Sequence, residues 1–138
     1  MKIFLSPILF NNTLFFEHLL FEGSKYIGRG EISDYIENAG GTLNANTTQD
    51  RTYYYEILPS NQLELGLWIE SERLLHANVD DKGVETQRQV VKEERRMRYD
   101  NRPYGTVIEE IMKRAFTKHP YSWTPIGSMA HLEAAKEI

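Results

Sequence analysis

Hydrophobic positions in the first half of the chain follow two different periods. Residues 14–21 are almost continuously apolar and are followed by Gly23, which predicts a short buried helix. Apolar side chains recur every three or four positions between residues 32 and 39, which predicts an amphipathic helix. Tyrosine and isoleucine side chains alternate along residues 52–57, which together with residues 42–46 predict a β-hairpin.

The second half of the chain contains only helical patterns. Leucine, isoleucine and tryptophan cover most of the circumference of residues 62–76, so we expect this helix to be packed on more than one side. A charge-rich helix is predicted from residue 84 to about residue 99, another over residues 106–116, and a last one over residues 129–138. Because these helices accompany one hairpin, the predicted fold class is α+β, an antiparallel sheet with helices packed on it.

Composition and charge restrict the functions that this chain suits. Its 138 residues, of which 41% are hydrophobic, suit a single ordered domain or part of one. The formal charge of −4, with Lys and Arg spread through both halves, argues against nucleic-acid binding. No run approaches the roughly 20 apolar residues of a membrane span. Because the chain has no cysteine, a metal would have to be bound by histidine and carboxylate side chains.

The first ten residues raise the question of export. Residues 1–10 carry one lysine and a short apolar run, as a truncated signal peptide would. Pro7 interrupts this run, and no small-residue cleavage site follows it. The alternative is an edge strand or a frayed start, so the sequence leaves the cell compartment open.

Glu17 and His18 lie inside the apolar segment 14–21. A buried carboxylate without a partner costs several kcal/mol, so we expect a group that compensates its charge. A metal ion is one such partner, since a helix can present histidine ligands one turn apart with a glutamate between them. The alternative is a helix boundary at which both side chains reach water or a capping partner.

Glu94 is the second candidate. The apolar positions of the charge-rich helix form one stripe, made by Val84, Val90, Val91 and Met97. At about 100° per residue the mean direction of this stripe falls almost on Glu94, whereas Glu93 is turned away. An inward glutamate and an inward histidine on different helices would suit a zinc site with mixed nitrogen and oxygen ligands. The alternative is an ion pair of Glu94 with Arg95 or Arg98.

Several segments share the motifs of one protein family. They are F-E-H-L-L-F-E-G-S at residues 16–24, G-G-T-L-N-A at residues 40–45, Y-Y-E-I-L-P at residues 54–59, E-S-E-R at residues 70–73, V-V-K-E-E-R-R at residues 90–96 and H-P-Y at residues 119–121. With these motifs the chain resembles the insulinase/pitrilysin zinc metallopeptidases, the inverzincins, whose zinc helix carries H-x-x-E-H. The resemblance extends over residues 14–138, whereas residues 1–13 match no part of the family pattern.

The resemblance implies a fold and a site. The fold would be an incomplete LuxS/metallopeptidase-like half-domain, part of the N-terminal peptidase domain, with a second half-domain or partner subunit expected outside this chain. Glu17 would be the general base, and His18 and Glu94 would be Zn²⁺ ligands. Asn44, Ala45 and Asn46 would form the edge strand on which an extended peptide substrate adds, although any hairpin edge can simply be solvated. Bacterial members of the family are often exported to the cell envelope.

Two positions depart from the family pattern. Where the first zinc-ligand histidine is expected, three positions before Glu17, this chain has Leu14. Catalytic zinc sites normally have three protein ligands, and leucine has no lone pair to donate, so we expect weak or absent zinc binding. Gln87 stands where many members have an auxiliary glutamate.

Three interpretations remain open at this point. The chain could be a fragment of a zinc metalloendopeptidase domain whose catalysis is impaired by Leu14. It could be a non-catalytic homologue that binds peptides or serves as a scaffold subunit. It could also have an altered start, in which residues 1–14 do not belong to the evolved protein. We favour metallopeptidase ancestry with impaired catalysis.

Overall fold

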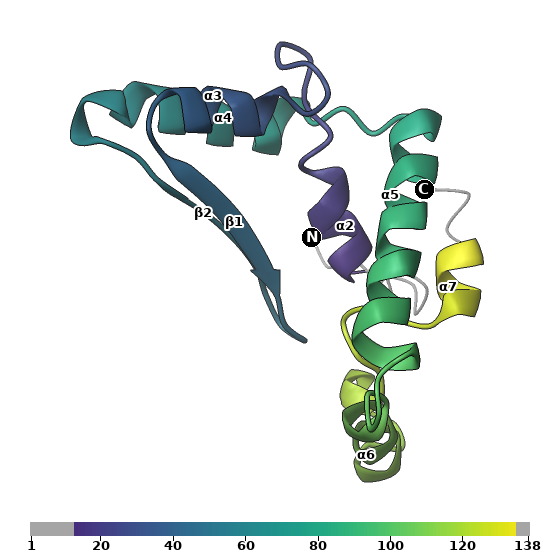
Figure 1. The fold of residues 1–138 in the computed structure, drawn as a ribbon. Helices are drawn as coiled ribbons and strands as arrows, with labels where there is room; N and C mark the ends of the chain where they lie inside the picture. The colour runs from purple at the N-terminus through teal and green to yellow at the C-terminus, as the bar shows by residue number, and fades with distance from the viewer. Residues whose placement is uncertain (1–12, 135–138) are drawn as a thin grey trace.

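The computed structural model describes residues 13–134, which form helices around one β-hairpin (Figure 1). The helices are α2 (Thr13–Leu19), α3 (Glu31–Asn38), α4 (Leu63–His76), α5 (Asp81–Arg95), α6 (Val107–Ala115) and α7 (Met129–Ala134), and the strands are β1 (Thr42–Thr47) and β2 (Thr52–Ile57). Short helical turns complete the list: η1 (Ser60–Gln62), η2 (Arg96–Asp100) and η3 (Pro120–Ser122). The α+β class is therefore confirmed.

The hairpin pairs β1 with β2 in antiparallel register, from Thr42 opposite Ile57 to Thr47 opposite Thr52. Every second residue of each strand is more exposed than its neighbours, as the alternation in the sequence predicts. Figure 1 shows α3 and α4 at one end of the hairpin and α2 between the hairpin and α5. This arrangement places the start of the chain's described part next to the sheet.

Two separate clusters of apolar side chains hold the helices in place. The first joins α2, α5 and α7 through Phe15, Leu19, Val91, Ile126 and Leu132. The second joins α3 and α4 to the hairpin through Ile27, Ile32, Ile36 and Ile69, with partly buried Leu43 and Leu58 packed against them. Burial of such side chains stabilises the fold by about 1.5–3 kcal/mol each. The first cluster therefore holds α2 against α5, and the second holds α3 and α4 at the hairpin.

The predicted packing of residues 62–76 on more than one side is wrong for the described structure. In α4 the leucines at positions 63, 67, 74 and 75 are 64–76% exposed. Its buried side chains are Ile69, Glu72 and Arg73, which share the face that contacts the rest of the described chain. Apolar residues around a helix show which faces could be buried, but the described elements pack against only one face of α4.

The charge-rich helix also differs in detail from the prediction. It begins at Asp81 instead of residue 84, because the carboxylate of Asp80 accepts a hydrogen bond from the N–H of Gly83 at 2.7 Å and caps it. The stripe that predicted an inward direction is only partly buried, since Val91 is covered but Val90 and Met97 are 44% and 60% exposed. The last helix is described over Met129–Ala134, and the rest of its predicted range, residues 135–138, lies outside the described residues.

None of the described helices has the length and apolar character required to cross a bilayer. The predictions made for residues 1–10 lie outside the described residues, as do residues 11 and 12. Whether the domain divides at residue 13, as the family resemblance implies, stays a prediction.

Candidate functional site

Glu17 is buried on α2, with 8% of its surface exposed. Its Oε2 accepts a hydrogen bond from the hydroxyl of Thr47 at the end of β1. The hydroxyl of Tyr54 on β2 donates to the backbone oxygen of the same residue at 3.2 Å. The sequence predicts a compensating partner for the buried carboxylate, and in the described structure a neutral hydroxyl provides it. Both contacts tie α2 to the hairpin.

His18 and Glu94 meet across α2 and α5. The distance from His18 Nε2 to Glu94 Oε2 is 3.2 Å, and both side chains are largely buried. Arg98 Nη1 lies 2.7 Å from the other oxygen of Glu94, so the inward direction of this glutamate and its pairing with an arginine occur together. The hydrogen bond from His18 lowers the pKa of Glu94. Burial opposes the charged imidazole, but the Glu94 carboxylate, together with Gln87 and Glu17, outweighs burial and raises the pKa of His18.

Gln87 contacts the other nitrogen of this imidazole. The distance from His18 Nδ1 to Gln87 Oε1 is 3.1 Å, and the amide nitrogen of Gln87 donates to the buried carboxylate of Glu22. Glu22 also pairs with Arg29 at 2.7 Å. Acceptor oxygens therefore face both imidazole nitrogens, which favours the protonated, doubly donating form of His18.

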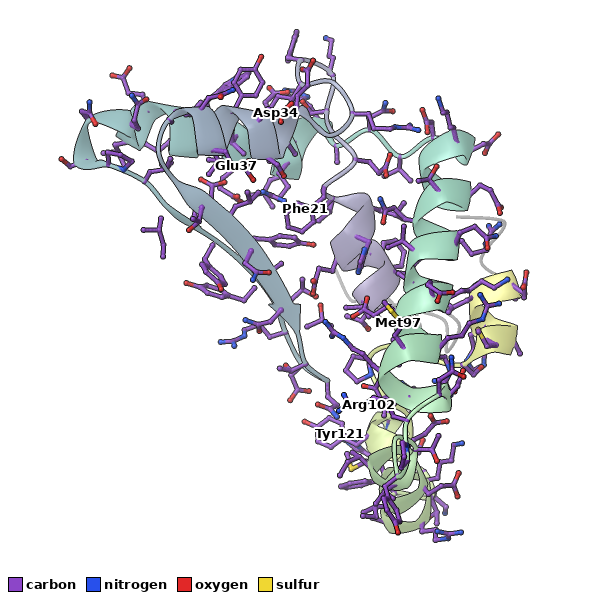
Figure 2. All side chains as sticks on the ribbon, viewed as in Figure 1. Phe21, Asp34, Glu37, Met97, Arg102 and Tyr121 are labelled. Atoms are coloured by element: carbon purple, nitrogen blue, oxygen red, sulfur yellow. The ribbon has the colours of Figure 1, made fainter. Side chains whose placement is uncertain are left out.

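A cleft of about 410 Å³ opens between α2, α5 and the hairpin. It is lined by Leu14, Glu17, His18, Phe21, Asn44, Ala45, Asn46, Thr47, Glu94 and Arg98. Figure 2 shows Phe21 in the space between α2 and the hairpin, where its ring lies 5.6 Å from that of Tyr54. All six site residues predicted from the sequence thus line one cleft, although they come from three segments of the chain.

The edge of β1 that borders this cleft presents backbone N–H groups that do not pair with β2. The N–H of Ala45 donates to the side-chain oxygen of Asn44 at 2.8 Å, so it does not serve the pairing with β2. The N–H of Thr48 bonds the carbonyl of Arg51 at 2.8 Å, and ladder bonds alternate along an antiparallel strand. This alternation directs the N–H groups of residues 43, 45 and 47 to the open edge, where Asn44 occupies the middle one.

The described donor set does not fit a three-ligand zinc site. His18 and Glu94 bring one nitrogen and one oxygen together, but Leu14 lines the cleft one helical turn before His18 and has no donor atom. Within residues 13–134, no group of three or more histidine, aspartate or glutamate side chains is placed to hold a metal ion.

Two contributors to the site were missed by sequence reasoning. Thr47 binds Glu17, and Arg73 donates from α4 to the carbonyl of Leu20 at 3.1 Å while its guanidinium lies 4.9 Å from the centre of the Phe21 ring. A threonine at a strand end carries no specific signal, and the E-S-E-R motif that contains Arg73 indicates the family but not this contact. Their roles depend on which segments meet, and hydrophobic periodicity does not report that.

Comparison with known proteins decides the family. The model of the family described as Insulinase (Peptidase family M16) matches residues 13–127. The chain belongs to the insulinase family of peptidases. The resemblance drawn from the motifs is confirmed by this match.

Relatives within the insulinase family include named zinc proteases. Zinc protease PqqE of Helicobacter pylori is 36% identical over 117 residues, which are 85% of this chain and 26% of that protein. The mitochondrial-processing peptidase subunit beta of Blastocladiella emersonii is 27% identical over 123 residues, 89% of this chain and 26% of that protein. This chain therefore spans about a quarter of the length of these relatives.

Solved structures share the fold. The crystal structure of a protease from Helicobacter pylori superposes with a TM-score of 0.84 at 33% identity, covering 90% of this chain and 30% of that one. Pitrilysin gives a TM-score of 0.69 at 26% identity, covering 86% of this chain and 13% of that one. The described elements are thus part of a peptidase domain of this family.

Proposed function

We propose that this chain is part of an insulinase-family metallopeptidase domain that binds an extended peptide in the cleft between β1 and α2 but hydrolyses it poorly or not at all. The observation that carries the proposal is the cleft itself, whose lining combines Glu17, His18 and Glu94 with the edge of β1 and with Leu14. The peptide class follows from the family, whose named relatives are zinc proteases.

Backbone pairing with β1 is the binding mode that we infer. The edge N–H groups of residues 43, 45 and 47 would donate to carbonyl groups of the peptide, and pairing through the main chain selects for extended shape more than for sequence. Before the N–H of Ala45 could bond the peptide, its hydrogen bond to the side-chain oxygen of Asn44 would have to break. The polar lining from Glu17, His18 and Glu94 lies beside the peptide, where the scissile bond of an active relative would be.

The impairment follows from the ligand count. With Leu14 in the cleft wall, His18 and Glu94 are paired with each other, and the buried carboxylate of Glu17 is held by Thr47. Each of these contacts satisfies a group that catalysis would need to have available. We therefore expect the chain to bind peptide without turnover. The non-catalytic interpretation, a homologue that binds peptides or serves as a scaffold, shares the first expectation.

The same proposal includes a further half-domain, on the same polypeptide or on a partner subunit, that encloses the peptide. The chain is similar in fold to the solved first half of the periplasmic protease PqqL of Escherichia coli. The match includes 89% of this chain but only 28% of that structure. The exposed leucines of α4 provide apolar surface for such a neighbour.

Fluorescence anisotropy with a labelled extended peptide tests the binding mode. Ala45→Pro removes the edge N–H without removing a bond between β1 and β2, because proline is tolerated at the open edge of a sheet. Ala45→Val is the matched control, since it keeps the N–H and adds similar bulk. We expect the proline variant to bind about 2- to 10-fold more weakly than the valine variant, the effect of one hydrogen bond.

Two results decide the proposal. If the unmodified chain binds no extended peptide, or if the proline and valine variants bind equally, the peptide cleft is refuted. If the unmodified chain cleaves a quenched fluorescent peptide at rates typical of peptidases, and an active-site variant Glu17→Gln stops the cleavage, impairment is refuted and the enzyme reading stands. Circular dichroism of each variant shows that the fold is retained.

A further inference from the structure

A second pocket, of about 240 Å³, lies where the tip of the hairpin meets the segment after α6. We name it the hairpin-tip pocket. It is lined by Thr13, Gln49, Asp50, His119, Pro120, Tyr121, Trp123 and Pro125. Figure 2 shows Tyr121 beside the tip of the hairpin, far along the sequence from the strands that it meets. Neither the motifs nor the family comparison assigns this pocket a role.

Hydrogen bonds hold its walls together. The hydroxyl of Tyr121 donates to Oδ2 of Asp50 at 2.5 Å. The N–H of Leu14 donates to the carbonyl of Pro125 at 3.3 Å, which fixes the start of α2 against the same segment. The N–H of Tyr121 donates to Nδ1 of His119 at 3.3 Å and orients that ring. Three segments distant in sequence therefore form one built pocket.

The walls combine π-electron faces with one negative charge. The rings of His119 and Tyr121 are 4.4 Å apart and nearly perpendicular, and Phe116 packs 5.5 Å from Tyr121 behind them. In the described part of the chain, Tyr121 is the only partner of the Asp50 carboxylate. The neighbouring Arg51 holds its guanidinium 5.2 Å over the ring of Tyr53 and forms no ion pair with Asp50 there. A carboxylate beside aromatic rings attracts a cationic side chain.

The hairpin-tip pocket adjoins the peptide cleft on two elements. At the start of α2, Thr13 lines the pocket and the next residue, Leu14, lines the cleft. At the end of β1, Thr47 lines the cleft and Gln49 lines the pocket. An extended chain lying along β1 advances about 3.3 Å per residue, so a side chain a short distance beyond the cleft meets this pocket.

We propose that the hairpin-tip pocket binds one arginine or lysine side chain of the peptide that lies in the cleft. Asp50 provides the charge, and the rings of His119, Tyr121 and Trp123 provide the surface on which the cation lies. The inference rests on the proposed peptide binding and adds a side-chain preference at one position. The ordered contact of Tyr121 with Asp50 means that the carboxylate is already in place before the peptide arrives.

Paired peptides test this inference on the full chain. One series carries a single arginine at successive positions of an otherwise neutral extended peptide, and the matched series carries citrulline, which has nearly the same shape without the charge. We expect the arginine peptide to bind about 3- to 10-fold tighter than its citrulline partner at one position of the series. Asp50→Asn should remove this difference without changing the affinity for the citrulline peptide.

Tyr121→Phe is the structural control, because it removes the hydrogen bond from Tyr121 to Asp50 but keeps the carboxylate. We expect the arginine preference to persist in that variant. If both peptides bind equally at every position, or if Asp50→Asn keeps the preference, the subsite is refuted while the cleft stands. If neither peptide binds the unmodified chain, the proposed function fails and the subsite fails with it.

Discussion

His18 and Glu94, on helices that are far apart in sequence, approach to 3.2 Å between Nε2 and Oε2. Two ligands of one tetrahedral zinc ion, each bound at about 2.0–2.2 Å, lie roughly 3.4 Å apart. The separation that serves an ion pair in this chain therefore also suits two members of a zinc site. What the described cleft lacks is a third donor, because Leu14 occupies the wall beside them.

Leu14→His should convert this pair into a zinc site. Histidines four residues apart on a helix share one face, so the new imidazole would join His18 and Glu94 in the cleft. We expect the variant to retain close to one zinc per chain after dialysis and the unmodified chain to retain little. Zinc at 100 times its Kd would stabilise the variant by about 2.7 kcal/mol, which a thermal melt with and without chelator detects.

The control for this gain is the double variant Leu14→His with His18→Ala, which should lose the metal again. Metal content by atomic absorption reads the outcome without any need for peptidase activity. Near-stoichiometric zinc in the unmodified chain, lost on His18→Ala, would show that two cleft ligands suffice and that the reasoning from Leu14 is wrong.

Two neighbouring arginines should differ sharply in their effect on stability. Arg95 is buried, lies 2.9 Å from Glu109 and donates to the carbonyl of Gly127. Arg96 is 47% exposed and pairs with Glu93 at 3.0 Å on the surface. Arg95→Ala removes the donor to Oε2 of Glu109 and to the carbonyl of Gly127, although Lys113 still pairs with Oε1 of Glu109 at 2.8 Å. Urea unfolding should therefore show a loss of about 1–3 kcal/mol for Arg95→Ala and less than about 0.5 kcal/mol for Arg96→Ala. Equal losses would contradict this assignment of burial.

The sequence predicts local features of this fold better than it predicts their partners. The hairpin follows from the alternation in residues 52–57, since apolar and polar side chains that alternate over six residues are typical of a half-buried β-strand. The inward direction of Glu94 follows from the helical period, even though Met97 on the same stripe is exposed. The direction in which a side chain leaves a helix depends only on its position relative to nearby residues of that helix, so it can be predicted from the sequence.

Contacts between distant segments were beyond that reasoning. Nothing in the charge pattern indicates that Gln87 would bridge His18 and Glu22, since amide and carboxylate side chains suit many partners. The packing of α4 was overestimated for a related reason, because Leu67 and Leu74 indicate a surface to be covered but not the element that covers it. The family motifs supplied what periodicity could not, namely that α2, β1 and α5 meet at one cleft.

Glu56 should make the stability of the hairpin depend on pH. Burial first, and the neighbouring Glu70 second, raise its pKa to about 7, while Arg73 acts in the opposite direction. A carboxyl group whose pKa is higher in the folded than in the unfolded chain stabilises the fold most at pH below 4.5, and this contribution is lost as pH rises through about 7. Its Oε1 is 3.8 Å from Arg73, too far for a strong ion pair.

Glu56→Gln isolates this effect, because glutamine resembles the neutral carboxyl group. The difference in free energy of unfolding between the variant and the unmodified chain should be small at pH 5 and should grow in favour of the variant by pH 8. Guanidinium titrations at four pH values measure it. A difference that stays constant over that range would mean that Glu56 titrates like an ordinary surface glutamate.

Asn44→Ala should strengthen peptide binding, because the Asn44 side chain occupies the edge N–H of Ala45 that an added strand would use. Without this competing acceptor, the peptide no longer has to displace the Asn44 side chain to bond the Ala45 N–H. We expect the Kd for the peptide to fall about 2- to 10-fold in an anisotropy titration. Asn46→Ala is the control, since Asn46 lines the same cleft. If both alanine variants weaken binding equally, the two side chains contact the peptide directly, and the Asn44 side chain does not compete with the peptide for the Ala45 N–H.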